Sequence, residues 1–177
     1  MGLEIRPERA SDFPAVRRVV AAAFGSDTEA DLVERIRASD EYRPELSFVA
    51  ADSGEVVGHV MIDGCMVRGE GGEREIVMLS PLAVAPDRQR SGAGTALIEH
   101  ALAAADRAGE PLVVLEGSPD YYGARGFEFA GDHGLSLPLP DWAPRAAAQV
   151  ALLSTYNPDD VTLRGRVVYP PSFDGLG

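Results

Sequence analysis

The sequence is poor in residues on which several classes of protein depend. It contains one cysteine, Cys65, so no internal disulfide can form, and its three histidines show no metal-ligand spacing. Cys65 lies in an apolar stretch, which favours a buried hydrophobic role over a nucleophilic one. No apolar run is long enough to span a bilayer, and the first residues lack the apolar centre of a signal peptide. We therefore predict a cytoplasmic protein without a disulfide, a bound metal or a membrane partner.

Positive charge is also scarce. The 16 basic residues are outnumbered by 28 acidic ones, which gives a formal net charge of −12. Affinity for nucleic acid comes largely from Lys and Arg on phosphates, so this balance argues against a nucleic-acid partner. An acidic surface weakly favours cationic partners through electrostatic steering, although solubility is the simpler explanation of the excess.

What the sequence does contain is an apolar segment, residues 79–84, that runs into a turn and then into a helical pattern from Thr95. The turn carries two arginines and two glycines, Arg88, Arg90, Gly92 and Gly94. A helix N-terminus offers N–H groups and the positive end of its dipole, and glycines let a phosphate approach the backbone. Strand, turn and helix therefore predict a phosphate or pyrophosphate site, with the arginines adding positive charge beside it.

The common phosphate-binding fingerprints do not fit this turn. The dinucleotide fingerprint needs a third small residue where Leu97 stands, and the chain has no Gly-Lys-Ser/Thr triplet. The pattern Gln89-x-x-Gly92-x-Gly94, after Leu82-Ala83-Val84, instead resembles the acyl-CoA pyrophosphate loop of the GNAT superfamily of N-acetyltransferases.

A second motif agrees with this resemblance. Tyr122-Gly-Ala-Arg-Gly126-Phe127 is similar to the Tyr-x-x-x-Gly-Phe segment of the family, and the two motifs occur in the family's order with a helix and a strand between them. Residues 116–127, together with the ending Val-Tyr-Pro-Pro-Ser-Phe173, resemble a bacterial subgroup of predicted acetyltransferases.

The resemblance implies an α/β (α+β) fold with a mixed, mostly antiparallel central sheet flanked by helices. In it, a parallel pair of strands is splayed at the acetyl-CoA site, and Pro81 marks a bulge. The apolar runs 75–84 and 112–116 predict this parallel pair independently, because a helix joins them through a right-handed crossover. Ligands of such sheets bind at the carboxyl ends of the strands, where the turn lies.

Periodicity and turn residues predict the remaining elements. Helices begin at Ser11 or Asp12, at Thr28 and after Gly94. Strands are expected over 3–7, 46–51, 56–63, 75–84, 112–116, 147–153 and 161–169, with one or two more within 127–139. We interpret Trp142 as a core or lid residue and residues 170–177 as a loose tail. The chain of 177 residues fits a single N-acetyltransferase domain over 1–177, completed by the late strands and tail of 131–177.

By resemblance, the cofactor is acetyl-CoA, used as the acyl-donor cosubstrate and held by the main chain. Backbone groups of Leu82, Ala83 and Val84 hold the pantetheine and the thioester. The pyrophosphate is bound by the backbone amides of seven consecutive residues, Gln89, Arg90, Ser91, Gly92, Ala93, Gly94 and Thr95.

Acetyl transfer from a thioester to an amine needs a neutral amine, donors for the carbonyl oxygen and a proton for the leaving thiolate. Tyr122 is the candidate acid, because the family places its tyrosine five residues before the Phe of Gly-Phe. A phenol with a pKa of ~10 is protonated at neutral pH and can donate to a thiolate whose acid has a pKa of roughly 8.5. Glu116 ends its strand and is the candidate base, with His59 and Glu75 as further candidates.

We therefore predict transfer of an acetyl group to a primary amine of a small molecule or peptide, by direct attack with Tyr122 as general acid. GNAT-like proteins are often homodimers. A non-catalytic acyl-CoA-binding sensor or partner module is the alternative from another class, and Tyr122 argues against it because a pure binder has no use for the acid. Transfer of a longer acyl group and O-acylation are the alternatives among enzymes.

Overall fold

The computed structural model describes residues 2–174, which form two compact units. Among the described residues, unit 1 comprises residues 2–63 and 79–104, and unit 2 comprises residues 64–78 and 105–174. The two long strands β3 (Glu55–Gly69) and β4 (Gly72–Val84) each contribute one part to either unit.

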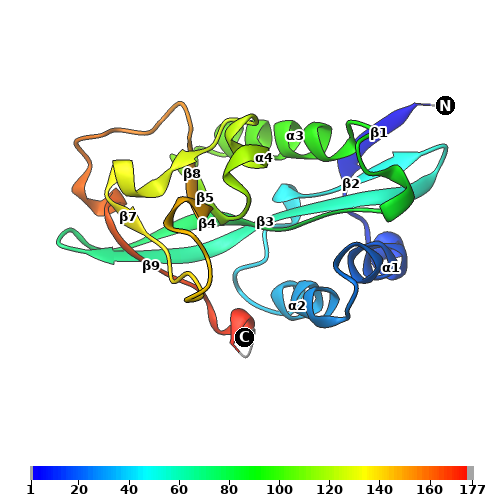
Figure 1. The fold of residues 1–177 in the computed structure, drawn as a ribbon, viewed down its shortest axis with the longest axis horizontal. Helices are drawn as coiled ribbons and strands as arrows, with labels where there is room; N and C mark the ends of the chain where they lie inside the picture. The colour runs from blue at the N-terminus through cyan, green and yellow to red at the C-terminus, as the bar shows by residue number, and fades with distance from the viewer. Residues whose placement is uncertain (1, 175–177) are drawn as a thin grey trace. The chain divides into compact units, whose positions relative to one another are not determined.

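Unit 1 is a sheet with helices on both faces. Its strands follow the order β1 (Leu3–Pro7), β2 (Ser47–Asp52), β3 and β4. β2 is antiparallel to β1 and to β3, in the register Val49↔His59. Figure 1 shows α1 (Phe13–Phe24) and α2 (Thr28–Arg37) on one face of these strands and α3 (Ala93–Arg107) on the other.

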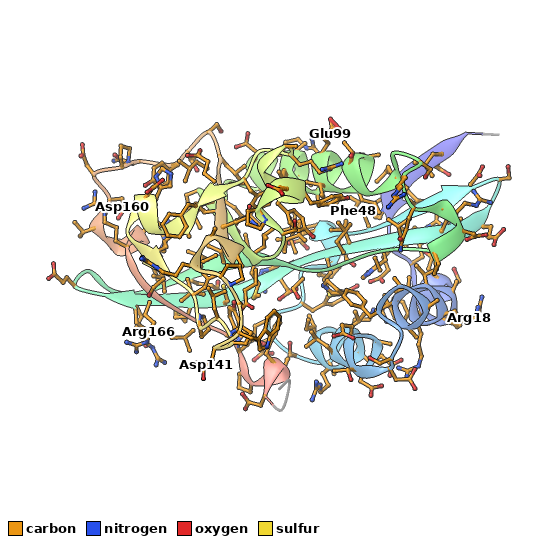
Figure 2. All side chains as sticks on the ribbon, in the orientation of Figure 1. Arg18, Phe48, Glu99, Asp141, Asp160 and Arg166 are labelled. Atoms are coloured by element: carbon orange, nitrogen blue, oxygen red, sulfur yellow. The ribbon has the colours of Figure 1, made fainter. Side chains whose placement is uncertain are left out.

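Successive side chains of a strand point to opposite faces of the sheet, and this alternation determines which side chains contact which helices. Phe48 of β2 lies on the α3 side (Figure 2), where its ring meets that of His100 at a centroid distance of 5.0 Å. A side chain at Gly58 of β3 would approach Leu97 of α3 within 2.9 Å, so the strand and the helix pack closely there. Ser47, Val49 and His59 therefore face α1 and α2.

The first helix differs from its prediction at its start. We expected Ser11 or Asp12 to cap it, but no side chain caps α1. The carboxylate of Asp12 turns back and accepts hydrogen bonds from Arg6, at 2.8 and 2.9 Å, and from the backbone N–H of Arg9. The predicted end is confirmed, because Gly25 adopts φ 71° and donates its N–H to Ala21.

Unit 2 is built around β5 (Leu112–Glu116), which pairs in parallel with β4 in the register Val77↔Val113 and confirms the predicted parallel pair. The other edge of β5 is antiparallel to β8 (Ala148–Leu152), and β8 pairs with β6 (Glu128–Phe129). β9 (Gly165–Val168) is antiparallel to β3 and parallel to β7 (Leu135–Ser136).

The apolar core of unit 2 comes from these strands and the segments that connect them. It consists of Cys65, Val67, Ile76, Met78, Leu112, Val114, Ala130, Leu135, Leu137, Ala148, Val150, Leu163 and Val167. Cys65 is buried among apolar side chains, as predicted from the sequence.

The predicted fold class, a mixed and mostly antiparallel sheet with helices on its faces, is confirmed. Several local details differ. A short helix, α4 (Pro119–Gly123), was not predicted, and the strands within 127–139 are only two residues long each. Trp142 is 83% exposed and therefore no core residue.

Short 3-10 turns join the elements, and they include part of the predicted tail. They are Ala10–Asp12, Pro44–Leu46, Pro86–Arg88, Ala130–His133, Arg145–Ala147, Val161–Leu163 and Pro171–Phe173. Residues 175–177 of that tail lie outside the described residues. None of the helices within residues 2–174 is long and apolar enough to cross a membrane.

Candidate active site

All the predicted cofactor residues belong to unit 1 and follow one another along the chain. Leu82, Ala83 and Val84 are the last three residues of β4. After the 3-10 turn Pro86–Arg88, the run from Gln89 to Gly92 leads into α3, and Ala93, Gly94 and Thr95 form its first three positions. The predicted strand, turn and helix are therefore present.

The turn owes its shape to two residues with left-handed backbone conformations. Gly92 has φ 93° and Arg90 has φ 65°, and a non-glycine residue at positive φ is uncommon. No atom lies within 4 Å of the position that a side chain would occupy at Gly92, so that side of the turn is open. The side-chain amide of Gln89 donates to the backbone carbonyl of Val84 at 3.1 Å and closes the turn onto the strand.

Arg88 differs from its prediction. We expected it to add positive charge beside the phosphate, but its guanidinium pairs with the carboxylate of Asp52 at the end of β2. The ion pair ties the turn to the β2–β3 hairpin, and Ala85 adds a backbone hydrogen bond to Val57 at 2.8 Å. Arg88 therefore anchors the turn, while Arg90 stays exposed on it.

The two predicted catalytic residues belong to unit 2. Glu116 ends β5 and is exposed, whereas Leu112 to Leu115 before it are buried. Its carboxylate accepts a hydrogen bond from the hydroxyl of Tyr169. Burial and this hydrogen bond raise the pKa of Tyr169 above its usual value, so the phenol remains the donor. This contact could not be predicted from the sequence, because the partners are 53 residues apart.

Tyr122 lies in α4, whose N-terminus is capped by Ser118. Its ring makes edge contacts with Tyr121 and Phe127, at centroid distances of 5.0 and 5.6 Å. A side chain at Gly117 would overlap the ring of Tyr122, so this glycine is required next to Glu116. Gly117 itself donates its N–H to the carbonyl of Ala147, and its carbonyl accepts from the side-chain amide of Gln149, at 3.0 Å each. These contacts bring the ends of β5 and α4 together and fix the ring of Tyr122.

The environment of Tyr122 keeps its hydroxyl protonated. Burial, together with the neighbouring Tyr121, raises its pKa to about 12, against a smaller opposite effect of Arg125. The phenol therefore carries its proton throughout the physiological pH range, as a general acid must. Tyr121 has a different environment, since the guanidinium of Arg125 stacks on its ring at 3.7 Å.

His59, a further candidate base, is fully buried in unit 1 among side chains that bind Glu8. The carboxylate of Glu8 lies 3.1 Å from Nε2 of His59 and accepts hydrogen bonds from Tyr42 at 2.8 Å, from Ser47 at 3.0 Å and from Arg37. Burial alone would raise the pKa of Glu8, but the contacts with His59 and Arg37 outweigh it and lower this pKa to about 2. We call these five residues the Glu8 cluster and assign it a structural role. Glu75, the other candidate, is exposed on β4.

Replacement of Glu8 by glutamine is expected to lower the free energy of unfolding by about 3 kcal/mol, because the partly buried Arg37 is left without its counter-charge. Denaturant titrations at pH 7 measure this change. The folded-state pKa of Glu8 is depressed, so its contribution is present above pH 4.5 and is lost as the pH falls towards 2. The difference between the wild type and Glu8→Gln should therefore shrink over that interval.

The matched control is Glu34→Gln. Glu34 also accepts a hydrogen bond from an arginine, Arg17, at 2.9 Å, but both side chains are exposed. Exposed pairs contribute little, so we expect less than about 1 kcal/mol. Equal unfolding midpoints for Glu8→Gln and Glu34→Gln would contradict a stabilising role of the Glu8 cluster.

Comparison with known proteins bears on the function of these residues. The family profile of the acetyltransferase (GNAT) domain matches residues 4–130. The chain belongs to the GNAT acetyltransferase family. It is 33% identical over 158 residues to the uncharacterised N-acetyltransferase YjhQ of Escherichia coli (strain K12), over 89% of this chain and 86% of YjhQ. The predicted family and the predicted enzyme class, an N-acetyltransferase, are thereby confirmed.

Two solved structures resemble this acetyltransferase over nearly its whole length. The GNAT family N-acetyltransferase YhbS of Escherichia coli, crystallised with CoA, has a TM-score of 0.84 and 31% identity over 99% of this chain and 93% of YhbS. A GNAT family acetyltransferase of Brucella melitensis, crystallised with acetyl-CoA, has a TM-score of 0.77 and 29% identity over 98% of this chain and 99% of that one. The ligands of these relatives support the prediction of acetyl-CoA as acyl donor.

No group of three or more His, Cys, Asp or Glu side chains that could hold a metal ion occurs within residues 2–174.

Proposed function

We propose that this acetyltransferase transfers the acetyl group of acetyl-CoA to a primary amine of a small molecule or peptide. The turn between β4 and α3 is the observation that carries the proposal. It combines an open glycine at φ 93° with the N-terminus of a helix of 15 residues, and this combination suits a pyrophosphate. CoA and acetyl-CoA in the two related structures agree with this use of the turn.

In the proposed complex, acetyl-CoA is held by the main chain. The backbone of Leu82, Ala83 and Val84 binds the pantetheine and the thioester, and amides from Gln89 to Thr95 bind the pyrophosphate. Binding by the main chain needs few side-chain contacts, which fits a turn whose Arg88 is already paired with Asp52. Arg90 is the exposed cation that we assign to the phosphates.

Tyr122 is proposed as the general acid that protonates the thiolate of CoA as it leaves. Two features support this role. Its pKa of about 12 keeps it protonated, and its ring is fixed by Tyr121, Phe127 and the absence of a side chain at Gly117. Because the acid is already held in place, no conformational entropy is lost in positioning it when the reaction occurs.

Glu116 is proposed as a general base that removes a proton from the acceptor nitrogen, directly or through water. Its position at the end of β5 and its hydrogen bond from Tyr169 support the proposal. Tyr169 acts as a positioning residue, because it donates to one carboxylate oxygen and leaves the other to accept a proton.

The test is release of CoA from acetyl-CoA with a panel of polyamines, aminoglycosides, amino acids and peptides. All 16 basic residues of the chain are arginines, so acetylation of the enzyme's own lysines cannot contribute to the signal. We expect turnover confined to one class of amine, with the acetylated product identified by mass spectrometry. Tight binding of acetyl-CoA by calorimetry without turnover of any amine would contradict amine transfer and favour a binding module.

A further inference from the structure

Gln149 is a buried polar side chain in an otherwise apolar strand of unit 2. It belongs to β8, where Ala148, Val150 and Ala151 are buried with it, and its own exposed fraction is 2%. A polar group in such a position costs free energy unless it is hydrogen-bonded. The side-chain amide of Gln149 donates to the backbone carbonyl of Gly117 at 3.0 Å. What Gly117 does in the sheet therefore determines what Gln149 contributes.

The bond from Gln149 takes the place of a backbone bond of the sheet. The β5–β8 register puts Gly117 opposite Ala147, and Gly117 donates its N–H to the carbonyl of Ala147 at 3.0 Å. In a regular antiparallel ladder, such a pair also exchanges the reverse bond. Here the N–H of Ala147 donates instead to the carbonyl of Pro144 at 2.9 Å, in the 3-10 turn before β8. The amide of Gln149 therefore supplies the donor that the ladder does not.

The peptide of Gly117 lies at the turn from β5 into α4, the helix that carries the proposed acid. The ring of Tyr122 packs directly against it, because a Cβ at Gly117 would come within 2.5 and 2.8 Å of two ring carbons. The first turn of α4 continues from the same peptide, since the N–H of Tyr122 donates to the carbonyl of Ser118 at 3.0 Å. A shift of the Gly117 peptide would therefore move or release the ring.

Alternation along β5 and β8 places Gln149 on the same side of the sheet as this ring. Gln149 lies opposite Leu115 in the register of the two strands, and the side chain that Gly117 lacks would point to the same face. The apolar core of unit 2 lies on the other face, where Val114 and Val150 contribute to it. Gln149 is therefore not part of that core, and its amide lies where the acid has to be held.

We propose that Gln149 is a positioning residue for Tyr122: its amide fixes the Gly117 peptide, and this peptide holds the phenol where it protonates the departing thiolate. The inference rests on the proposed role of Tyr122 as general acid and deepens it. Gln149 touches no reacting atom and adds no chemical step. Its contribution is geometric, and a misplacement of a reacting group by about 1 Å can lower the rate about 100-fold.

A double-mutant cycle of Gln149→Met and Tyr122→Phe is the test, with the best acceptor of the amine panel. Methionine is unbranched like glutamine and similar in length, but it has no amide donor. We expect Gln149→Met to lower kcat about 10- to 100-fold and to leave the Kd for acetyl-CoA unchanged. The Tyr122→Phe background has no hydroxyl to misplace, so the same substitution should change its kcat less than about twofold.

Gln149→Asn is a second variant at the same position. It keeps an amide but is one methylene shorter, so its donor falls short of the carbonyl of Gly117. We expect the same loss of kcat, and the same absence of a further loss in the Tyr122→Phe background, because the reach of the amide matters rather than its polarity.

Val150→Ala is the matched control for stability. Val150 is the next residue of β8, is fully buried and belongs to the apolar core on the opposite face. Its truncation leaves a cavity and lowers the free energy of unfolding. Because the contact between Gln149 and Gly117 remains, we expect kcat to stay within about threefold of the wild type at temperatures well below the unfolding midpoint.

The outcomes are separable. Wild-type kcat in the two Gln149 variants, or a loss that is equally large in the Tyr122→Phe background, would overturn the positioning role and leave the acid role of Tyr122 intact. Wild-type kcat in Tyr122→Phe itself would overturn the acid role and this inference with it.

Discussion

Gly92→Val is expected to abolish binding of acetyl-CoA. The backbone at Gly92 has φ 93°, a conformation that a β-branched residue does not adopt without strain. No neighbouring atom would clash with the valine, so the effect arises from the backbone and from the methyl groups that then cover the open side of the turn. Loss of two hydrogen bonds to the charged pyrophosphate, at about 1.5–3 kcal/mol each, corresponds to a rise in Kd of about 100-fold or more.

Calorimetric titration with acetyl-CoA measures this effect, and Gly72→Val provides the control. Gly72 begins β4 at the β3–β4 turn, has φ 96° and has no atom within 4 Å of the added side chain. The strain is therefore similar, and we expect a comparable loss of stability but an unchanged Kd. Wild-type affinity in Gly92→Val would refute the assignment of the turn to the pyrophosphate.

Tyr122→Phe is expected to lower kcat by about 10²- to 10⁴-fold without changing the Kd for acetyl-CoA. The substitution removes only the hydroxyl. The ring contacts with Tyr121 and Phe127 and the fit against Gly117 remain, so the fold of α4 is retained. Without the phenol, the thiolate departs without its proton donor, and the loss should appear in kcat rather than in binding.

Initial rates of CoA release over a range of pH test this expectation, with Tyr121→Phe as the control. Tyr121 is the adjacent tyrosine, and its ring is stacked under Arg125 at 3.7 Å. We expect its variant to keep kcat within a few-fold of the wild type. A Tyr122→Phe enzyme with wild-type kcat at every pH would exclude Tyr122 from the mechanism.

Most of the features that the sequence analysis did not predict are contacts between residues far apart in the chain. Arg88 and Asp52 are 36 residues apart, and Tyr169 and Glu116 are 53 residues apart. Neither contact produces a periodic pattern in the sequence from which it could be predicted. The residues of the Glu8 cluster likewise come from the position after β1, from α2, from the α2–β2 connection, from β2 and from β3. His59 was thus a reasonable candidate base from its residue type, and only its surroundings assign it a structural role.

Asp63 illustrates the same limit more sharply. The sequence predicted Asp63 as the last residue of a strand over 56–63, and it did not show whether the carboxylate would find a partner. The structure shows instead one uninterrupted strand over Glu55–Gly69, with Asp63 inside it and without a partner among the described residues.

The sequence by itself determined the features that depend on local interactions. Apolar runs specified the parallel strands β4 and β5, glycines specified the turn before α3 and the end of α1, and the spacing of two motifs identified the family. Tertiary structure alone decided the state of the charged groups. Whether Arg88, Glu116, His59 or Asp63 meets a counter-charge depends on which distant segment packs against it, and desolvation by that segment sets the energy of its charge.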